Sequence, residues 1–253
     1  MPRKLGPLSL LAIVRELRRG TGDQRPIAVA GARELVPLLA RELRNGGDAS
    51  AVVEHRVENA AVLVWVGPPD EEALRAAERA RIPIIAVTND EHVPYVLATD
   101  LVPVPAGQGF PVDAVVRAIA HRLGEDGTAL AARLPVLRRA VSEELIRSFS
   151  RKNAVISAAV FIPGVDMPVL TLNQIRLVLR IALAYGQDID RQRSVEIAGV
   201  VGAGFGLRAL ARQLLDLIPV AGWVVKGGVA YTGTRAIGEA AVRYFEERTA
   251  ARP

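Results

Sequence analysis

The sequence predicts an α/β N-terminal domain built on a parallel sheet, followed by an all-α domain of packed helical hairpins. Two observations carry this prediction. In the first half of the 253 residues, short apolar runs alternate with helix-like segments, as in parallel α/β sheets. From Asn153 onward the chain changes to apolar segments rich in Gly and Ala and punctuated by prolines.

The composition limits the chemistry of both parts. Half of the residues are hydrophobic but only 4% are aromatic, so the core must be built from closely packed Ala, Val, Leu and Ile. The chain has no cysteine, which excludes disulfides, thiolate metal sites and cysteine nucleophiles. This usage fits a reducing compartment, and a cytoplasmic location is expected.

The positive charge lies in the C-terminal part. Residues 1–150 hold 19 basic and 19 acidic side chains, whereas residues 151–253 hold 13 and 8, which accounts for the net charge of +5. Such a surface can attract anionic lipid, an acidic partner or nucleic acid. Nucleic acid is the least favoured of these, because the arginines are dispersed and no recognised nucleic-acid-binding module is present.

An N-terminal amphipathic helix is predicted for residues 1–24, since Leu10, Ile13, Val14 and Leu17 fall on one face. Two interpretations stay open for this segment, a helix packed on the protein and a helix lying on a membrane surface. No signal peptide is predicted here, because no small-residue cleavage site follows the apolar stretch.

Residues 25–124 predict the α/β domain. Its strands are expected at 26–31, 60–66, 82–87 and, more weakly, 101–104. Its helices are expected at 34–44, 70–81 and 112–123, where apolar residues recur at helical spacing or charged residues mark an exposed crossover.

This order of elements resembles a Ras-like or Era-like GTPase domain, and the strand end Val87-Thr-Asn-Asp90 is similar to the guanine-reading motif. A phosphate loop that started at Gly31 would have Val36, Pro37 and Leu38 where Gly, Lys and Ser/Thr are needed. The resemblance therefore implies a degenerate GTPase domain without GTP hydrolysis. An ordinary α/β domain, whose glycines merely turn the chain at strand ends, is the open alternative.

Residues 125–152 predict a connecting helix, and residues 153–253 predict the helical domain. Its uncharged runs, such as 154–165 and 167–175, are shorter than the roughly 20 residues that a membrane-spanning helix requires. The Ile-Pro pairs at Pro163 and Pro219 each predict a hairpin corner, because proline ends one helix and suits the first turn of the next.

Several phrases in this part are similar to the helical domain of the YcjF-like family. They include Phe161-Ile-Pro-Gly-Val-Asp-Met-Pro168, Asn173-Gln-Ile-Arg176 and Leu217-Ile-Pro-Val-Ala-Gly222. The resemblance covers roughly residues 137–248. It implies a domain of unknown biochemical activity that is paired with small GTPases or GTPase-like domains and associated with bacterial inner membranes.

Polar side chains within the apolar helical part are the candidates for specific interactions: Gln174, Arg176, Arg180, Thr232, Thr234 and Arg235. They are expected to form a buried network or to line a cleft for an anionic group. Small residues, among them Gly227, Gly228, Gly233 and Gly238, are expected to let helices approach closely.

No catalytic, cofactor-binding or metal-binding residue is predicted. His55, His92 and His121 are isolated and lack metal-ligand spacing, and no nucleophile motif occurs. The leading hypothesis is a non-catalytic interaction or scaffold protein, with a pseudo-GTPase domain and a helical domain for docking or oligomerisation. Its expected partners are a GTPase, an anionic membrane surface or a second copy of the chain. The alternative is a nucleotide-binding regulatory protein or an unconventional NTPase.

Overall fold

The computed structural model describes residue 17 and residues 23–105, 107, 109–159, 167–187 and 223–250. The chain divides into two compact units. Residues 23–141 form the α/β unit, and residues 142–253 together with 1–22 form the helical unit. Each unit is described by itself.

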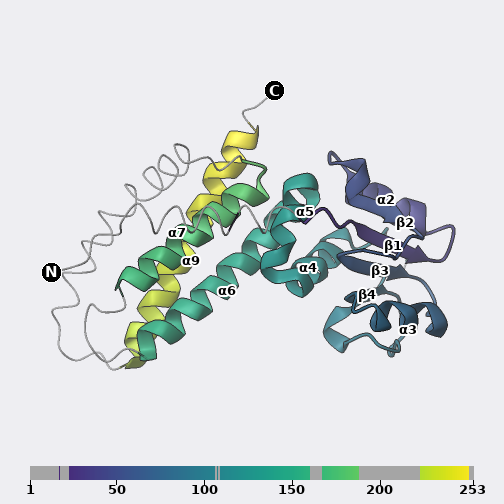
Figure 1. The fold of residues 1–253 in the computed structure, drawn as a ribbon, viewed down its shortest axis with the longest axis horizontal. Coiled ribbons are helices and arrows are strands. Elements are labelled where there is room, and N and C mark those ends of the chain that lie inside the picture. The colour runs from purple at the N-terminus through teal and green to yellow at the C-terminus, as the bar shows by residue number, and fades with distance from the viewer. Residues whose placement is uncertain are drawn as a thin grey trace. The chain divides into compact units, whose positions relative to one another are not determined.

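The α/β unit contains one five-stranded parallel sheet (Figure 1). Its strands are β1 (Ile27–Gly31), β2 (Val52–Glu54), β3 (Val62–Val66), β4 (Ile84–Val87) and β5 (Leu101–Val102). The order across the sheet is β2-β1-β3-β4-β5, and every neighbouring pair is parallel. The chain thus builds outward from β1 in one direction to β2 and in the other to β3, β4 and β5.

Helices cover both faces of this sheet, which explains why the central strands are buried along their length. Helices α2 (Val36–Arg44) and α4 (Val112–Leu123) contact each other and lie on one face. Helix α3 (Glu71–Arg79) lies on the other face, where Leu74 and Ala77 pack among small and aromatic residues of the strands (Figure 1). The predicted α/β fold with a parallel sheet is confirmed.

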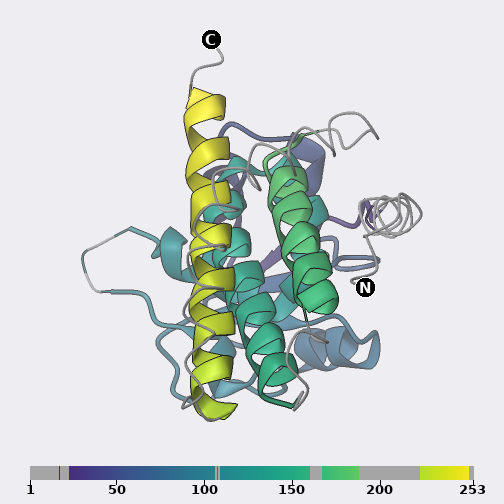
Figure 2. The same ribbon diagram turned by 90° about the vertical axis from the view of Figure 1, so that its left-hand side faces the viewer.

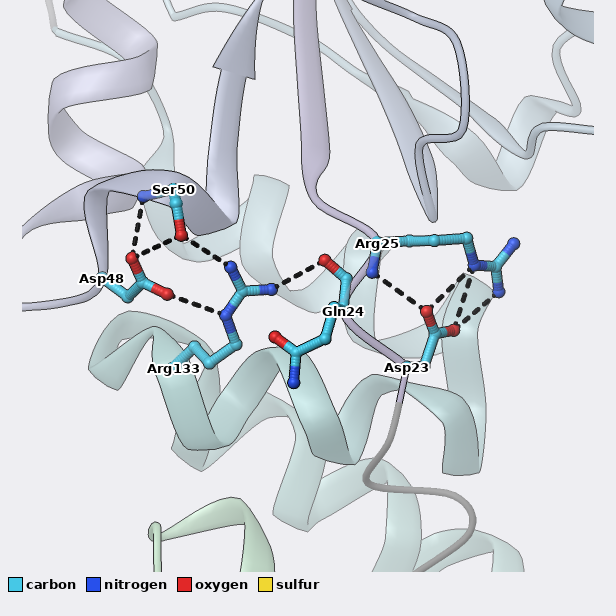
Figure 3. A network of polar contacts seen from close by, with 6 residues as sticks. All are labelled: Asp23, Gln24, Arg25, Asp48, Ser50 and Arg133. Atoms are coloured by element: carbon cyan, nitrogen blue, oxygen red, sulfur yellow. Dashed lines mark hydrogen bonds and ion pairs between the residues drawn. The ribbon is translucent and has the colours of Figure 1, made fainter.

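Arg133, at the end of α5 (Gly127–Arg133), ties the segment after α4 to the sheet (Figure 3). Its guanidinium donates to Asp48 Oδ2 at 2.9 Å, to Ser50 Oγ at 3.0 Å and to the carbonyl oxygen of Gln24 at 3.0 Å. The pKa of the Asp48 carboxyl falls to about 2, chiefly because Ser50 donates to it, with Arg133 adding to the effect.

The segment predicted as one connecting helix over 125–152 has a different structure. It forms the short turn η3 (Gly124–Asp126), then α5, η4 (Pro135–Leu137) and the start of α6 (Arg138–Ala159). Leu130, Leu134 and Leu137 are buried, so residues up to 141 belong to the α/β unit. Their apolar side chains complete its core instead of bridging to the next part.

In the helical unit, α6 packs with α7 (Met167–Ala184) and α9 (Trp223–Ala250) (Figure 2). The core between them includes Leu145, Leu177 and Phe245. Leu17 is helical and is buried against Leu179, so at that residue of the predicted amphipathic helix the packed interpretation holds. The hairpin corners predicted at Pro163 and Pro219 lie outside the described residues.

Two of the predicted small-residue contacts are present in α9. A Cβ on Gly238 would overlap the side chain of Ile146, and one on Gly227 would lie 3.2 Å from the carbonyl oxygen of Ala154. Gly228, in contrast, faces open space. Within the described part of the chain, none of the helices has both the length and the apolar character needed to cross a membrane.

Candidate functional site

A crevice of about 760 Å³ lies at the carboxyl edge of the sheet. The ends of β3 and β4 form its floor with Val66, Gly67 and Val87. The crevice lies beside the point between β1 and β3 where the strand order reverses, and open α/β sheets bind their ligands at such a point. It is therefore the candidate site of the α/β unit.

The turns at this edge depend on two glycines. Gly31 ends β1 with a φ of 122°, and its α-carbon lies so close to the Val66 carbonyl that an added Cβ would overlap it. Gly67 ends β3 with a φ of 93°. Neither conformation suits a residue with a side chain. The next turn is fixed by Trp65, whose Nε1 donates to the carbonyl oxygen of Pro68 at 2.9 Å.

One wall of the crevice comes from Leu35, which directly precedes α2, and from Leu38, Arg41 and Glu42 of α2. These positions recur at three- or four-residue spacing and so lie along one side of the helix. Leu38 is 44% exposed although it is a large apolar side chain. An exposed leucine that lines a crevice offers apolar contact area to a ligand.

The opposite wall follows β4 and β5. The Thr88 hydroxyl donates to Asp90 Oδ2 at 3.0 Å and accepts from the Asp90 backbone N–H at 3.2 Å. The Asn89 Oδ1 atom accepts from the Val104 backbone N–H at 2.9 Å. Phe110 and Val112, just before and at the start of α4, add apolar surface. A mostly apolar crevice with a few fixed polar groups is typical of a small-molecule site.

The side chains that line the crevice are of kinds that bind and orient a small ligand. The Thr88–Asp90 pair is a local turn of the kind that Thr and Asp side chains make with neighbouring backbone, so its hydroxyl serves the turn. Among the described residues, no cluster of His, Asp or Glu is placed to hold a metal ion. The three positions that replace the phosphate-loop motif lie at the start of α2, where Val36 is buried and Leu38 lines the crevice.

The helical unit holds a second polar cluster, which joins three helices. Asn153 of α6 is fully buried and donates through Nδ2 to Thr234 Oγ1 of α9 at 2.9 Å. Asn173 of α7 donates through Nδ2 to Asn153 Oδ1 at 2.9 Å. Asn153 thus links the other two helices.

The candidate residues of this unit occupy different surroundings. Thr234 belongs to the buried cluster, and Arg176 Nη1 lies 3.5 Å from Asn173 Oδ1 at its margin. Gln174 and Arg180 are partly buried on α7. Arg235 is exposed and pairs with Glu239 at 2.7 Å, and Thr232 is exposed and donates to the carbonyl oxygen of Gly228 at 3.0 Å.

Asn153 was missed, although the sequence carries its signal. Val141, Leu145 and Phe149 recur every four residues, and the same interval reaches Asn153, so the buried face of α6 continues through a polar residue. Leu38 and Phe110 were also missed as crevice residues, because sequence spacing does not show which apolar side chains meet at a sheet edge.

Comparison of the chain with protein-family models, with curated proteins and with solved structures finds no match. The resemblances to the YcjF-like helical domain and to a GTPase domain therefore stay predictions that rest on the sequence phrases.

Proposed function

We propose that the protein is a non-catalytic binding and interaction protein, in which the α/β unit holds a small ligand and the helical unit docks on another surface. The observation that carries the proposal is the apolar crevice at the carboxyl edge of the sheet. Its position is where doubly wound sheets bind ligands, and its volume lies in the range of small-molecule sites.

Substitution of Leu38 tests the ligand-binding part. Thermal unfolding of the full chain is followed with and without each member of a small-metabolite panel, and at least one member is expected to raise the melting temperature. L38E places a charge on the crevice wall and is expected to abolish that rise. The matched control is L97E, because Leu97 is also apolar and 55% exposed but does not line the crevice. A rise that survives in L38E would contradict the proposal.

A more specific form of this proposal is that the α/β unit is a degenerate GTPase domain. The strand order gives it no support, and it rests on the sequence resemblance alone. It predicts no release of phosphate from GTP or ATP above the background without protein. Hydrolysis by the full chain that is lost in L38E would favour the alternative, an unconventional NTPase.

For the helical unit we propose docking on an anionic membrane surface, in line with the YcjF-like resemblance and with a peripheral location at the inner face of the cell membrane. Val155 of α6 is 68% exposed, and Val169 of α7 and Val229 of α9 are also exposed. Gly227 approaches Ala154, and Asn173 bonds Asn153, so the segments of α6, α7 and α9 that carry these valines lie near one another. Exposed Arg151 and Lys152 precede Val155 on α6. Basic and apolar side chains together are typical of membrane-surface segments.

Sedimentation with vesicles tests this docking. The full chain is expected to pellet with vesicles that contain phosphatidylglycerol and to stay in solution with phosphatidylcholine vesicles. V155D is expected to weaken pelleting, whereas L97D, a change of the same kind in the α/β unit, is expected to leave it unchanged. Equal pelleting with both lipids would contradict docking on an anionic surface. If neither lipid pellets the chain, membrane docking fails, and a dimer or a complex with a GTPase would then be the remaining partners.

A further inference from the structure

The start of α2 borders the crevice but offers few groups to an anion. A helix N-terminus binds phosphate through backbone N–H groups that have no partner in the helix. Here the N–H groups of Leu35 and Val36 both donate to the carbonyl oxygen of Ala32, at 3.0 and 3.1 Å. The next residue is Pro37, which has no N–H. Three donors that a phosphate would use are therefore occupied or missing.

The start of α4 is similarly occupied. The Val112 N–H donates to the carbonyl oxygen of Phe110 at 2.8 Å, and the N–H groups of Ala114 and Val115 donate to that of Pro111 at 2.9 and 3.0 Å. The remaining residue of this first turn is Asp113, whose negative charge would repel an anion. Neither helix that borders the crevice is thus arranged to hold phosphate.

The charges of the residues that line the crevice also disfavour an anionic ligand. Its acidic side chains are Glu42 and Asp90, and its basic side chain is Arg41. Arg41 already lies 3.7 Å from Glu42, which partly satisfies its charge. The lining therefore carries a net negative charge, and an anionic ligand would gain little from Arg41 and would be repelled by Asp90.

Two consecutive residues after β4, Asn89 and Asp90, offer a donor and an acceptor to the crevice. Because Asn89 Oδ1 accepts from the Val104 N–H, its Nδ2 group is left to donate within the described residues. Because Asp90 Oδ2 accepts from Thr88, its Oδ1 atom is left to accept. An adjacent acceptor and donor on the edge of a planar ring would match this pair. Leu38 and Phe110 supply apolar surface for the faces of such a ring.

We propose that the crevice binds an uncharged planar heterocycle, free or as its nucleoside, and discriminates against the phosphorylated form. This rests on the proposed function, that the crevice holds a ligand. The heterocycle would accept a hydrogen bond from Asn89, donate one to Asp90 and bury its ring against the apolar walls.

Calorimetric titration of the full chain tests the proposal with adenosine, guanosine and riboflavin, each beside its monophosphate. At least one uncharged probe is expected to bind, and its monophosphate is expected to bind about tenfold more weakly or worse. N89A and L38E are expected to weaken binding of the uncharged probe, and L97E is expected to leave it unchanged. D90N is expected to reduce the difference in affinity between the uncharged probe and its monophosphate.

Three outcomes would overturn the proposal: a monophosphate that binds as tightly as its uncharged form, an affinity that N89A and L38E leave intact, or no binding by any uncharged probe. The metabolite panel described above separates this failure from that of the proposed function. If an anionic metabolite stabilises the chain in a Leu38-dependent way, the crevice is a ligand site of another class. If no metabolite does so, both proposals fail.

Discussion

Gly31 and Val66 meet where β1 and β3 end, with the Gly31 α-carbon against the Val66 carbonyl. The same carbonyl oxygen accepts the N–H of Ala32 at 2.9 Å, so the chain turns off β1 while it remains bonded to β3. This contact sets the start of α2 beside the crevice.

G31A is expected to lower the free energy of unfolding by about 3 kcal/mol, because the methyl group would overlap the Val66 carbonyl and the φ of 122° does not suit alanine. G46A is the matched control, since Gly46 also has a positive φ but faces open space. Urea unfolding of both variants checks the difference. Equal losses would show that backbone conformation, and not the contact with Val66, governs the effect.

R133K is expected to destabilise the α/β unit by about 1 to 2 kcal/mol, because lysine cannot reproduce the three directed bonds to Asp48, Ser50 and Gln24. R41K, at an exposed position with a longer ion pair, is expected to change stability little. Urea unfolding followed by tryptophan fluorescence checks both, since Trp65 lies in the sheet. An unchanged midpoint for R133K would mean that the network does not hold α5.

Asp100 predicts a dependence of stability on pH. Its side chain is 1% exposed, both carboxyl oxygens lack hydrogen-bond partners, and Arg122 lies 3.6 Å away. Burial raises the pKa of the Asp100 carboxyl above its usual 3.8, and Arg122 offsets this only in part. The folded protein therefore holds this proton more tightly than the unfolded chain, so the stabilisation is fully present below pH 3.8 and is lost as pH rises through the raised pKa.

D100N keeps the shape and removes the charge. It is expected to be more stable than the natural protein at neutral pH and to lose the decline in stability above pH 3.8. Unfolding free energies measured across pH check this. The lowered pKa of Asp48 acts in the opposite direction and only below that pH, so it does not obscure the result. A less stable D100N at neutral pH would show that the buried charge is favourable in its surroundings.

N153A is expected to destabilise the helical unit by about 2 to 3 kcal/mol, because it leaves the buried Thr234 and the partly buried Asn173 without their shared partner. The double variant N153A/T234V is expected to lose less unfolding free energy than the sum of the losses of the two single variants. Hydrogen exchange of the α9 amides in the full chain checks this coupling. Strict additivity would mean that Asn153 and Thr234 do not stabilise each other.

The sequence predicted much of the sheet because its central strands are continuous apolar runs. It missed β2, which is three residues long and lies at the edge, where pairing with β1 and not hydrophobic pattern defines the strand. The extent of the α/β unit was also missed, since the burial of Leu134 and Leu137 depends on tertiary packing.

Candidate site residues were harder to predict than strands. The sequence marks Thr88, Asn89 and Asp90 as a motif at a strand end. Leu38 and Phe110, in contrast, lie far apart in sequence and line the same crevice only because of the fold. In the helical part, Thr234 was named, whereas its partner Asn153 lies in a segment that reads as part of a continuous helix. The four-residue spacing from Val141 places Asn153 on the buried face of its helix, but no local spacing shows which residue of another helix it bonds.

Amide chemical-shift mapping of the full chain with adenosine, guanosine and riboflavin tests most directly whether the crevice binds an uncharged planar ligand. At least one uncharged probe is expected to shift the amides of Leu38, Asn89 and Phe110, with smaller shifts from its monophosphate at the same concentration. Absence of shifts at these residues, or larger shifts with the monophosphate, would contradict the assignment of this crevice to an uncharged planar ligand.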